Sequence, residues 1–279
     1  MTYVLFDIGG TKTRVAVSKD LKQFAEPISF KTPKKFEEGI DAIVEAVKKM
    51  ETGPITAAAG GVRGVLSEDR SEIMDDSALS AWVEEPLKEN LKKKLKTEVY
   101  IENDSAVVAL GEAHFGAGQG ADIMVYHTVS TGVGGAKIEQ GHIDSFSVGF
   151  EPGKQILDID RTILGEDVLP TLENLVSGTA LEARTGVKPY EIPQSDAVWD
   201  QLAYYLAHGL RNSVLYWSPD VIVLGGSMIV GDPRILLDDI IKHTQAVLGE
   251  EVPCPLLKDA ELGSVGGLYG AMALLEQRT

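Results

Sequence analysis

A glycine-rich turn near the start of the chain has the composition of a phosphate site. Asp7 ends an apolar run and is followed, after one residue, by Gly9, Gly10, Thr11 and Lys12. Two glycines let a backbone approach an anion with no Cβ in the way, and the N–H groups and the Thr11 hydroxyl are donors for phosphate oxygens. Asp7 is placed to hold a hydrated Mg²⁺ ion. An ordinary hairpin turn, in which glycines are common, explains the same residues.

A second turn of this kind lies in the second half of the chain. It spans residues 130–135 and contains Thr131 and Gly132. Alone it also fits a hairpin, but two such turns in equivalent places of a duplicated fold would face each other and hold one polyphosphate. Gly225 and Gly226 follow a buried apolar run, where bare backbone suits the packing of a nucleotide's base and ribose. The alternative for this third turn is a simple strand exit.

Asp104 is the candidate general base. When a phosphoryl group is transferred to an alcohol, a carboxylate within ~3 Å of the attacking hydroxyl accepts its proton and accelerates the reaction roughly 10²–10⁴-fold. Asp104 follows Asn103 and precedes an apolar helical stretch at 106–115. Because both residue types are also preferred at a helix N-cap, capping alone is the alternative.

Three further polar residues, Glu151, Lys154 and Glu173, are candidates for sugar contacts. Carboxylates accept hydrogen bonds from sugar hydroxyls in pairs. Taken singly, each of the three is more typical of an ordinary surface residue than of a sugar contact. The five histidines show no spacing typical of metal ligands, and none is assigned a role.

Two familiar nucleotide-binding signatures are absent. Residues 149–155 resemble a P-loop only superficially, because three residues rather than four separate the glycines and Gln155 stands where Ser or Thr must meet Mg²⁺. No G-x-G-x-x-G motif lies between a strand and a helix, since the glycine turns open into strands. A dinucleotide oxidoreductase is therefore disfavoured.

Strands and helices must position these residues, and the apolar pattern predicts them in two similar halves. The first half opens with strands at 3–8 and 13–18 around the first glycine turn, and the second with strands at 123–130 and 136–139 around the second. This repetition predicts an internal duplication, with a central cleft between two α/β lobes. Further helices are expected at 36–50, 80–95, 106–115, 199–217 and 268–277, and further strands at 55–59, 98–102 and 221–224.

The glycine cluster at 116–120 is the expected seam between the lobes. We expect a smaller N-terminal α/β lobe at 1–116 and a larger C-terminal α/β lobe at 117–267. The apolar C-terminal helix, within 268–279, is expected to pack back on the first lobe because it otherwise lacks a partner.

Composition narrows the function further. Of the 279 residues, 44% are apolar and 24% are charged, as in a globular protein with a sizeable core. The net charge of −16 repels nucleic-acid phosphates and acidic membrane surfaces, so neither is an expected partner. The single cysteine, Cys254, excludes an intrachain disulfide and a cysteine-based zinc site. With no basic leader and no apolar stretch of ~20 residues, a cytoplasmic protein is expected.

Six segments together resemble the repressor, open-reading-frame and kinase (ROK) family of bacterial sugar kinases. The resemblance covers nearly the whole chain and implies a two-lobed α/β fold of the actin and hexokinase type, which is ribonuclease H-like. The segments are Asp7–Arg14 and Thr131–Gly135 (phosphate loops), Glu102–Glu112 (catalytic Glu-Asn-Asp), Gly149–Lys154 (Glu-x-Gly-His), Leu172–Gly178 (Leu-Glu-x-x-x-Ser-Gly) and Pro219–Ser227 (adenosine motif).

The resemblance implies a role for each sugar-site candidate. Asp104 would be the general base, and Asn103 would share the hydroxyls of the acceptor sugar with it. Glu151 and Glu173 would complete the sugar pocket. Gly61 lies where the family has an Ala-x-Pro-Gly turn lining that pocket, although the proline is missing here.

The resemblance also implies a nucleotide site. Asp7 would orient Mg²⁺ through water, and the adenosine motif would include Gly225 and Gly226. The ATP phosphates would be held by Gly9, Gly10, Thr11 and Lys12 together with Thr131 and Gly132.

The chain departs from the family pattern at the zinc site. Family members carry zinc on the histidine of Glu-x-Gly-His and on three cysteines, but this chain has Lys154 at the histidine and no cysteine between 155 and 172. No structural zinc is therefore expected. Because that histidine also touches the sugar in the family, Lys154 would alter specificity by contacting a substrate hydroxyl or acidic group, unless it only pairs with a nearby carboxylate.

These observations predict an ATP- and Mg²⁺-dependent, glucokinase-like kinase that phosphorylates a hexose at its 6-OH. The expected acceptor is glucose-like or an N-acylated hexose. The alternative is a sugar- and nucleotide-binding regulatory protein of the same family without turnover. A DNA-binding repressor is disfavoured, because the first strand begins at residue 3 and the net charge opposes DNA. A homodimer is an expectation from the family alone.

Overall fold

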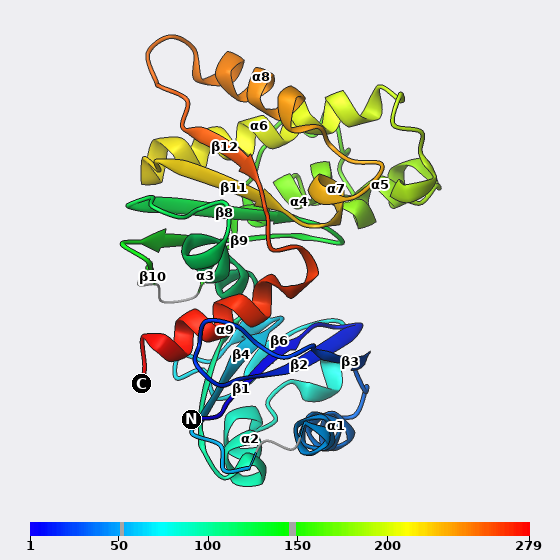
Figure 1. The fold of residues 1–279 in the computed structure, drawn as a ribbon. Coiled ribbons are helices and arrows are strands. Elements are labelled where there is room, and N and C mark those ends of the chain that lie inside the picture. The colour runs from blue at the N-terminus through cyan, green and yellow to red at the C-terminus, as the bar shows by residue number, and fades with distance from the viewer. Residues whose placement is uncertain (51–52, 145–148) are drawn as a thin grey trace. The chain divides into compact units, whose positions relative to one another are not determined.

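Two five-stranded sheets of the same topology organise the computed structural model, which describes residues 1–50, 53–144 and 149–279 (Figure 1). The first sheet has the strand order β3-β2-β1-β4-β7 and the second β10-β9-β8-β11-β12. In both, the first two pairings are antiparallel and the last two are parallel. This repetition is the duplicated α/β fold that the two glycine turns predict.

The strands are close to the ranges expected from the sequence. The first sheet comprises β1 (Tyr3–Ile8), β2 (Lys12–Ser18), β3 (Ile28–Lys31), β4 (Ala57–Val62) and β7 (Glu98–Asn103). A small separate sheet pairs β5 (Val65–Leu66) with β6 (Ile73–Asp75). The second large sheet comprises β8 (Ile123–Val129), β9 (Val133–Glu139), β10 (His142–Ile143), β11 (Val221–Gly225) and β12 (Leu256–Asp259).

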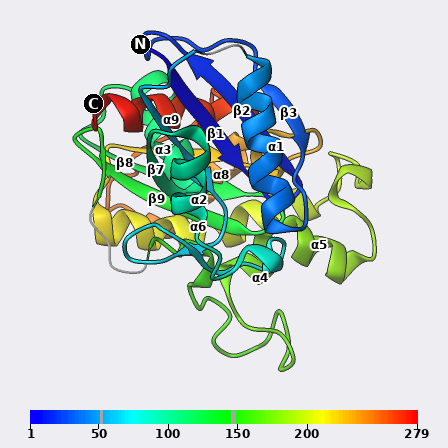
Figure 2. The same cartoon turned by 90° about the horizontal axis from the view of Figure 1, so that it is seen from below.

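Helices cover both faces of the first sheet. On one face lie α1 (Phe36–Lys49) and α2 (Leu87–Leu95), whose apolar stripes join the core beneath β1 and β2. Figure 2 shows α1 lying over the side of the sheet that carries β2 and β3. On the other face lie α3 (Asp104–Phe115) and α9 (Gly266–Glu276), both of which contact β4.

Glycines let α3 and α9 approach closely. A Cβ on Gly111 of α3 would lie 2.6 Å from the Gly266 carbonyl oxygen of α9. No side chain would fit at Gly270 of α9 either, because its Cβ would overlap the backbone of Val107. This contact docks the C-terminal helix onto the helix that begins at Asp104.

One expected helix starts later than its periodicity suggests. The pattern at 80–95 predicts a continuous helix, but the structure has a short 3₁₀ turn, η1 (Ser80–Trp82), and α2 begins only at Leu87. Pro86 stands at the N-cap of α2, and proline restricts the residue before it to extended backbone. Trp82 is buried and supplies the apolar signal upstream of that break.

The longest helix of the second unit, α6 (Val198–Trp217), packs against α4 (Leu172–Val176) and α8 (Leu237–Leu248). This helix, α6, holds a continuous buried stripe that includes Trp199, Leu206 and Leu210. The other helices and turns of this unit are η2 (Pro152–Lys154), α5 (Gly178–Thr185), η3 (Pro189–Glu191) and α7 (Ser227–Val230). The turn η4 (Gly263–Val265) stands where the chain passes from the second unit to the first. The apolar faces of α4, α6 and α8 share one core with β8 and β11.

The first compact unit contains Met1–Phe115 and Ser264–Thr279, and the second contains Gly116–Asp144 and Phe150–Gly263. A functional division into lobes at 116/117 stays a prediction. Within the described residues, no helix is both long and apolar enough to cross a membrane.

Candidate active site

The carboxyl ends of three parallel strands bring candidate residues of the first unit together. Strand pairing sets Asp7 of β1 opposite Gly61 of β4, and Gly61 opposite Glu102 of β7. Asn103 is the last residue of β7, and Asp104 is the first residue of α3. Ligands of parallel α/β sheets bind at this edge. It is therefore the candidate catalytic centre of the first unit.

Gly61 brings the start of α3 against the sheet. A Cβ at this position would lie 3.0 Å from the Cα of Asp104 and 3.4 Å from the Cβ of Val107. A larger residue would push the first turn of α3 outward. The structure thus gives Gly61 a packing reason that is independent of any contact with sugar.

Asn103 caps α3, so only one of the two carboxylate oxygens of Asp104 is engaged by the first turn of the helix. The Asn103 Oδ1 atom accepts the N–H groups of Ser105 at 2.9 Å and Ala106 at 3.3 Å, while its Nδ2 atom donates to the Gly64 carbonyl at 3.1 Å. The Oδ1 atom of Asp104 accepts the N–H of Ser105 at 2.8 Å. In the described chain, no hydrogen bond reaches the Asp104 Oδ2 atom. That oxygen is available to a substrate hydroxyl.

Burial controls the charge of both aspartates at this edge. It raises the pKa of Asp104, against the opposing effects of the Ser105 N–H and the Arg63 cation. Burial also raises the pKa of Asp7 to about 6, while the ion pair with Arg14 at 3.1 Å lowers it and the charge of Asp104 raises it. The two carboxyl groups are thus close enough to influence each other.

The first glycine turn is fastened by its own backbone and by Thr32. The N–H of Gly9 donates to the Lys12 carbonyl at 3.0 Å, and the N–H of Thr32 donates to the Thr11 carbonyl at 3.0 Å. The Thr32 hydroxyl donates to the Gly9 carbonyl at 2.6 Å. In the described residues, the N–H groups of Gly10 and Thr11 have no backbone acceptor. Those two amides are the donors that the turn offers to a phosphate.

The reason for a glycine at position 10 is a close neighbour and not the backbone angle, because the φ of Gly10 is not positive. A Cβ there would lie 2.6 Å from the Ala78 Cβ. Thr11 and Lys12 are exposed beside it, so their side chains are accessible to a ligand.

The second turn is tied to two of the sugar-site candidates. Glu173 accepts the N–H of Val133 at 2.9 Å and forms an ion pair with Lys154 at 3.2 Å. Gly132 leaves room for this carboxylate, because a Cβ there would lie 2.7 Å from the Glu173 Oε2 atom. Glu173 is 29% exposed and Lys154 is 62% exposed. The pairing with a carboxylate, one of the options left open for Lys154, is therefore present.

Glu151 is near this group along the chain but exposed. It precedes η2, and its backbone carbonyl accepts the N–H of Lys154 at 3.0 Å. Pro152 and Gly153 of η2 pack directly on β9, where a Cβ on Gly153 would lie 2.4 Å from the Val133 carbonyl oxygen. The short turn therefore anchors Glu151 and Lys154 beside the second glycine turn.

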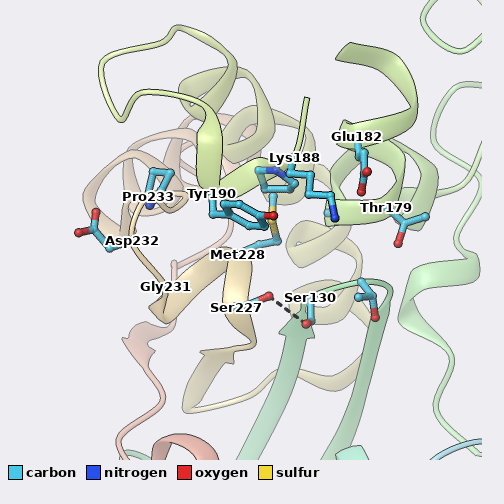
Figure 3. A pocket seen from close by; sticks show the side chains of 13 residues that line it. Ser130, Thr179, Glu182, Lys188, Tyr190, Ser227, Met228, Gly231, Asp232 and Pro233 are labelled. Carbon is cyan, nitrogen blue, oxygen red and sulfur yellow. Dashed lines mark hydrogen bonds between the residues drawn. The ribbon is translucent and has the colours of Figure 1, made fainter. Parts of the chain in front are cut away.

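A cavity of about 330 Å³ lies beyond the second turn (Figure 3). Figure 3 shows the hydroxyls of Ser130 and Ser227 joined at 3.0 Å on one side, with Tyr190 and Met228 on the other. Its lining residues come from the second glycine turn, from α5 and η3, and from α7 and the segment after it; they are Ser130, Thr131, Gly178, Thr179, Glu182, Lys188, Pro189, Tyr190, Ser227, Met228, Gly231, Asp232 and Pro233.

Gly225 and Gly226 lead into this cavity without lining it. A Cβ on Gly225 would lie 2.3 Å from the Tyr126 hydroxyl, and Gly226 has a φ of +88° with the Val129 carbonyl at 2.3 Å from its Cβ position. The two glycines thus turn the chain sharply from β11 into α7, which presents Ser227 and Met228 to the cavity.

Sequence reasoning missed several residues at these sites. Arg63 and Thr32 contact the first turn from distant parts of the chain, and Gly267 of α9 packs on Asp7. The segment around Tyr190 contributes to the cavity although it carries no motif. The one local signal for Arg63 is its place two residues after the glycine pair Gly60-Gly61.

The residues at Asp7 fit a nucleotide-bound magnesium ion better than a protein-only metal site. Within the part of the chain that the structure describes, no three His, Cys, Asp or Glu residues form a ligand cluster. Mg²⁺ usually keeps several waters and takes one or two carboxylates plus substrate phosphates. A single carboxylate beside a phosphate-type turn meets that requirement, and a nearby cation would favour its charged form.

Two α/β units with matching sheets and matching glycine turns define the actin and hexokinase type of fold, and comparison with known proteins identifies the group within it. The chain belongs to the ROK family, whose model matches residues 3–278.

Similar proteins span the whole chain. It is 27% identical to a fructokinase from Lactococcus lactis subsp. cremoris over 98% of this chain and 97% of that protein. A ROK hexokinase structure from Thermus thermophilus matches with a TM-score of 0.84 and 29% identity, covering 100% and 99% of the two chains. A ROK family glucokinase from Streptomyces griseus, in complex with glucose and AMPPNP, matches with a TM-score of 0.81 and 28% identity over 99% and 100%.

Proposed function

We propose that this chain is an ATP-dependent sugar kinase that transfers the γ-phosphoryl group of Mg·ATP to the 6-OH of a hexose. Membership of the ROK family and whole-length similarity to fructokinases and glucokinases support a sugar phosphotransferase. The similar structure with bound AMPPNP supports ATP as the donor. The observation that carries the proposal is the Asp104 Oδ2 atom, which accepts no hydrogen bond in the described residues and belongs to a carboxylate close to Asp7 and the first glycine turn.

The phosphates are proposed to bind at the two glycine turns. In the first, the amides of Gly10 and Thr11 donate, together with the Thr11 hydroxyl and the exposed Lys12. Gly9 contributes by shaping this turn. In the second, Thr131 and Gly132 take the same part, and the adjoining cavity, with a volume in the range typical of ligand pockets, receives the nucleoside behind Gly225 and Gly226.

The sugar is proposed to contact Asn103 and Asp104 of the first unit and Glu151, Lys154 and Glu173 of the second. Gly61 lets the start of α3 lie close to β4, and so determines where Asn103 and Asp104 stand in the proposed sugar site. Lys154 already pairs with Glu173, so its ammonium orients that carboxylate and still presents donors to a hydroxyl or an acidic group on the sugar. Glucose-like and N-acylated hexoses are the proposed acceptors.

The proposed mechanism is proton removal combined with positioning. Asp104 accepts the proton of the sugar hydroxyl while that oxygen attacks the γ-phosphorus, and ADP leaves. Asn103 keeps the Asp104 side chain oriented by capping the helix on which it lies. Asp7 would hold Mg²⁺ through water, and the ion would neutralise phosphate charge when bound.

The experiment is coupled ADP release with Mg·ATP against a panel of glucose, fructose, mannose, N-acetylglucosamine, N-acetylmannosamine and allose. We expect turnover on one or a few sugars, a loss of at least ~100-fold in kcat for Asp104→Asn, and unchanged sugar binding by calorimetry. Asp41→Asn, an exposed carboxylate on α1, is the matched control. Near-normal kcat in Asp104→Asn would remove the general-base assignment, and turnover on no sugar would favour a binding protein.

A further inference from the structure

Arg63 stands at the carboxyl edge of the first sheet, next to the first glycine turn. It follows the last residue of β4, and its backbone N–H donates to the Ile8 carbonyl at 3.1 Å. A Cβ on Gly10 would lie 3.1 Å from the Arg63 Cδ atom and 3.2 Å from its Nη1 atom. The guanidinium therefore lies against the residue whose amide is proposed to bind phosphate.

A buried carboxylate fixes one side of this guanidinium. The Arg63 Nε atom donates to the Asp76 Oδ2 atom at 2.7 Å, and the Asp76 side chain is only 5% exposed. The Oδ1 atom of Asp76 accepts the N–H groups of Ala78 at 2.7 Å and Leu79 at 2.6 Å. Asp76 is held by two amides and in turn holds Arg63, so the guanidinium keeps a defined direction.

The other side of the guanidinium is open to a ligand. Across residues 1–50, 53–144 and 149–279, the terminal Nη1 and Nη2 groups of Arg63 donate no hydrogen bond. The side chain is 35% exposed, and its charge reaches the Asp104 carboxylate. A planar guanidinium fork matches the oxygens of phosphate, and here it is aimed between a phosphate-type turn and the proposed base.

We infer that Arg63 binds the terminal phosphoryl group of the nucleotide and stabilises it during transfer to the sugar. This inference rests on the proposed kinase function. The bond between the γ-phosphorus and the ADP oxygen breaks, a bond from that phosphorus to the sugar oxygen forms, and the hydroxyl proton passes to Asp104. Arg63 gives up no proton and acts through charge and hydrogen bonds on the phosphoryl oxygens.

The test compares two nucleotides that differ only beyond the β-phosphate. Calorimetry measures the Kd of Mg·AMPPNP and of Mg·ADP for the wild-type chain and for Arg63→Met. We expect the Kd of AMPPNP to rise about 10-fold or more, the Kd of ADP to change less than about 2-fold, and kcat with the best sugar to fall at least ~100-fold. Arg63→Lys keeps the charge but not the planar guanidinium group, so its Kd for AMPPNP and its kcat should lie between those of the wild type and of Arg63→Met.

Lys94→Met is the matched control. Lys94 lies in the same unit, is 31% exposed, close to the 35% of Arg63, and forms an ion pair with Asp41 at 2.6 Å, so its loss removes a cation of similar exposure from a pair outside the proposed site. It should change neither Kd nor kcat, and thermal melting checks that each variant is folded. Should Arg63→Met unfold, the AMPPNP-to-ADP ratio of Arg63→Lys decides.

Three outcomes would overturn the inference. One is a folded Arg63→Met variant with an unchanged AMPPNP-to-ADP ratio and unchanged kcat. A second is a variant that loses only sugar affinity, which would make Arg63 an acceptor contact. In the third, the wild-type chain binds neither nucleotide, and the proposed kinase function fails together with the role of Arg63. In the first two outcomes the kinase itself still turns over, so the two failures are distinguishable.

Discussion

At the scale of residues, the first glycine turn depends on a buried pair of hydroxyls. Because the Thr32 hydroxyl donates its proton to the Gly9 carbonyl, the 2.9 Å contact between Thr13 and Thr32 must have Thr13 as the donor. Both threonines are about 1% exposed. Thr32 is thus a positioning residue: its hydroxyl and its N–H hold the Gly9 and Thr11 carbonyls, while in the described residues the Gly10 and Thr11 amides have no backbone acceptor.

Thr32→Val removes this hydroxyl at nearly constant volume. We expect a loss of about 1–3 kcal/mol in the free energy of unfolding, because the Gly9 carbonyl and the Thr13 hydroxyl lose their buried partner. We also expect KM for ATP to rise about 10-fold with a smaller change in KM for the sugar. Urea unfolding and steady-state kinetics measure both effects, and Thr32→Ser should restore them. Equal changes in the two KM values would contradict the assignment.

Residue types and spacing predicted Asp7, Asn103, Asp104 and the glycine turns as candidates, because each motif is contiguous in the chain. The same reasoning could not find Arg63 or Thr32. Their contacts with the first turn cross more than 20 residues of sequence. They are created only when β3 pairs with β2, and β2 and β4 pair with β1. The roles of all these residues in catalysis stay predictions.

At the scale of elements, the crossing of α3 and α9 determines where Asp104 stands. The start of α3 is confined between Gly61 of β4 and the glycines of α9, so a change in α9 is transmitted to the residue that begins α3. Apolar periodicity predicted both helices but not the closeness of the contact. Glycines such as Gly111 and Gly270 weaken the sequence pattern of a helix. Why glycine occupies these positions can be explained only when the helix packed against them is known.

Gly270→Ala tests this contact. The added Cβ would overlap the Val107 backbone, so we expect a loss of about 1–3 kcal/mol in the free energy of unfolding and a fall in kcat as α3 is displaced. Urea unfolding and kinetics are the measurements. Glu276→Ala, an exposed change at the end of the same helix, should stay within about 0.5 kcal/mol of the wild type. An unchanged stability in Gly270→Ala would show that α3 and α9 are not tightly docked.

At the scale of the whole molecule, the repeated strand, glycine turn and strand predicted the duplicated fold, and this prediction is confirmed by the two identical sheet orders and by the family. The signal was strong because it repeats a pattern of several elements. The acceptor sugar could not be predicted in the same way. In the proposed site, the sugar contacts a few side chains from separate segments, among them Lys154, and the residues that surround them are not set by any contiguous motif.

Global stability should respond to pH through His127 of β8. Burial lowers its pKa to about 4, compared with about 6.5 in an unfolded chain, and its Nε2 atom lies 2.9 Å from the Ser213 hydroxyl. The unfolded chain therefore binds more protons between pH 6.5 and 4. From this residue alone, we expect the free energy of unfolding to fall by about 3 kcal/mol as the pH is lowered across that window.

Urea unfolding of the wild type and of His127→Gln between pH 7 and 4 isolates this contribution. Asp7 acts in the opposite direction, because its raised pKa makes the folded chain bind a proton first as the pH falls from about 6. Its contribution cancels in the difference between the two proteins. The destabilisation of the wild type relative to the variant should grow as the pH falls, and a difference independent of pH would contradict it.

Phosphorylation of a hexose by ATP is the reaction proposed for this chain. The most direct measurement is ³¹P and ¹H NMR of the products formed from Mg·ATP and the sugar that gives the highest turnover, with Asp104→Asn in parallel. We expect equal amounts of ADP and a hexose 6-phosphate from the wild type, and almost none from the variant. ADP with inorganic phosphate and unmodified sugar, or equal product from both proteins, would contradict it.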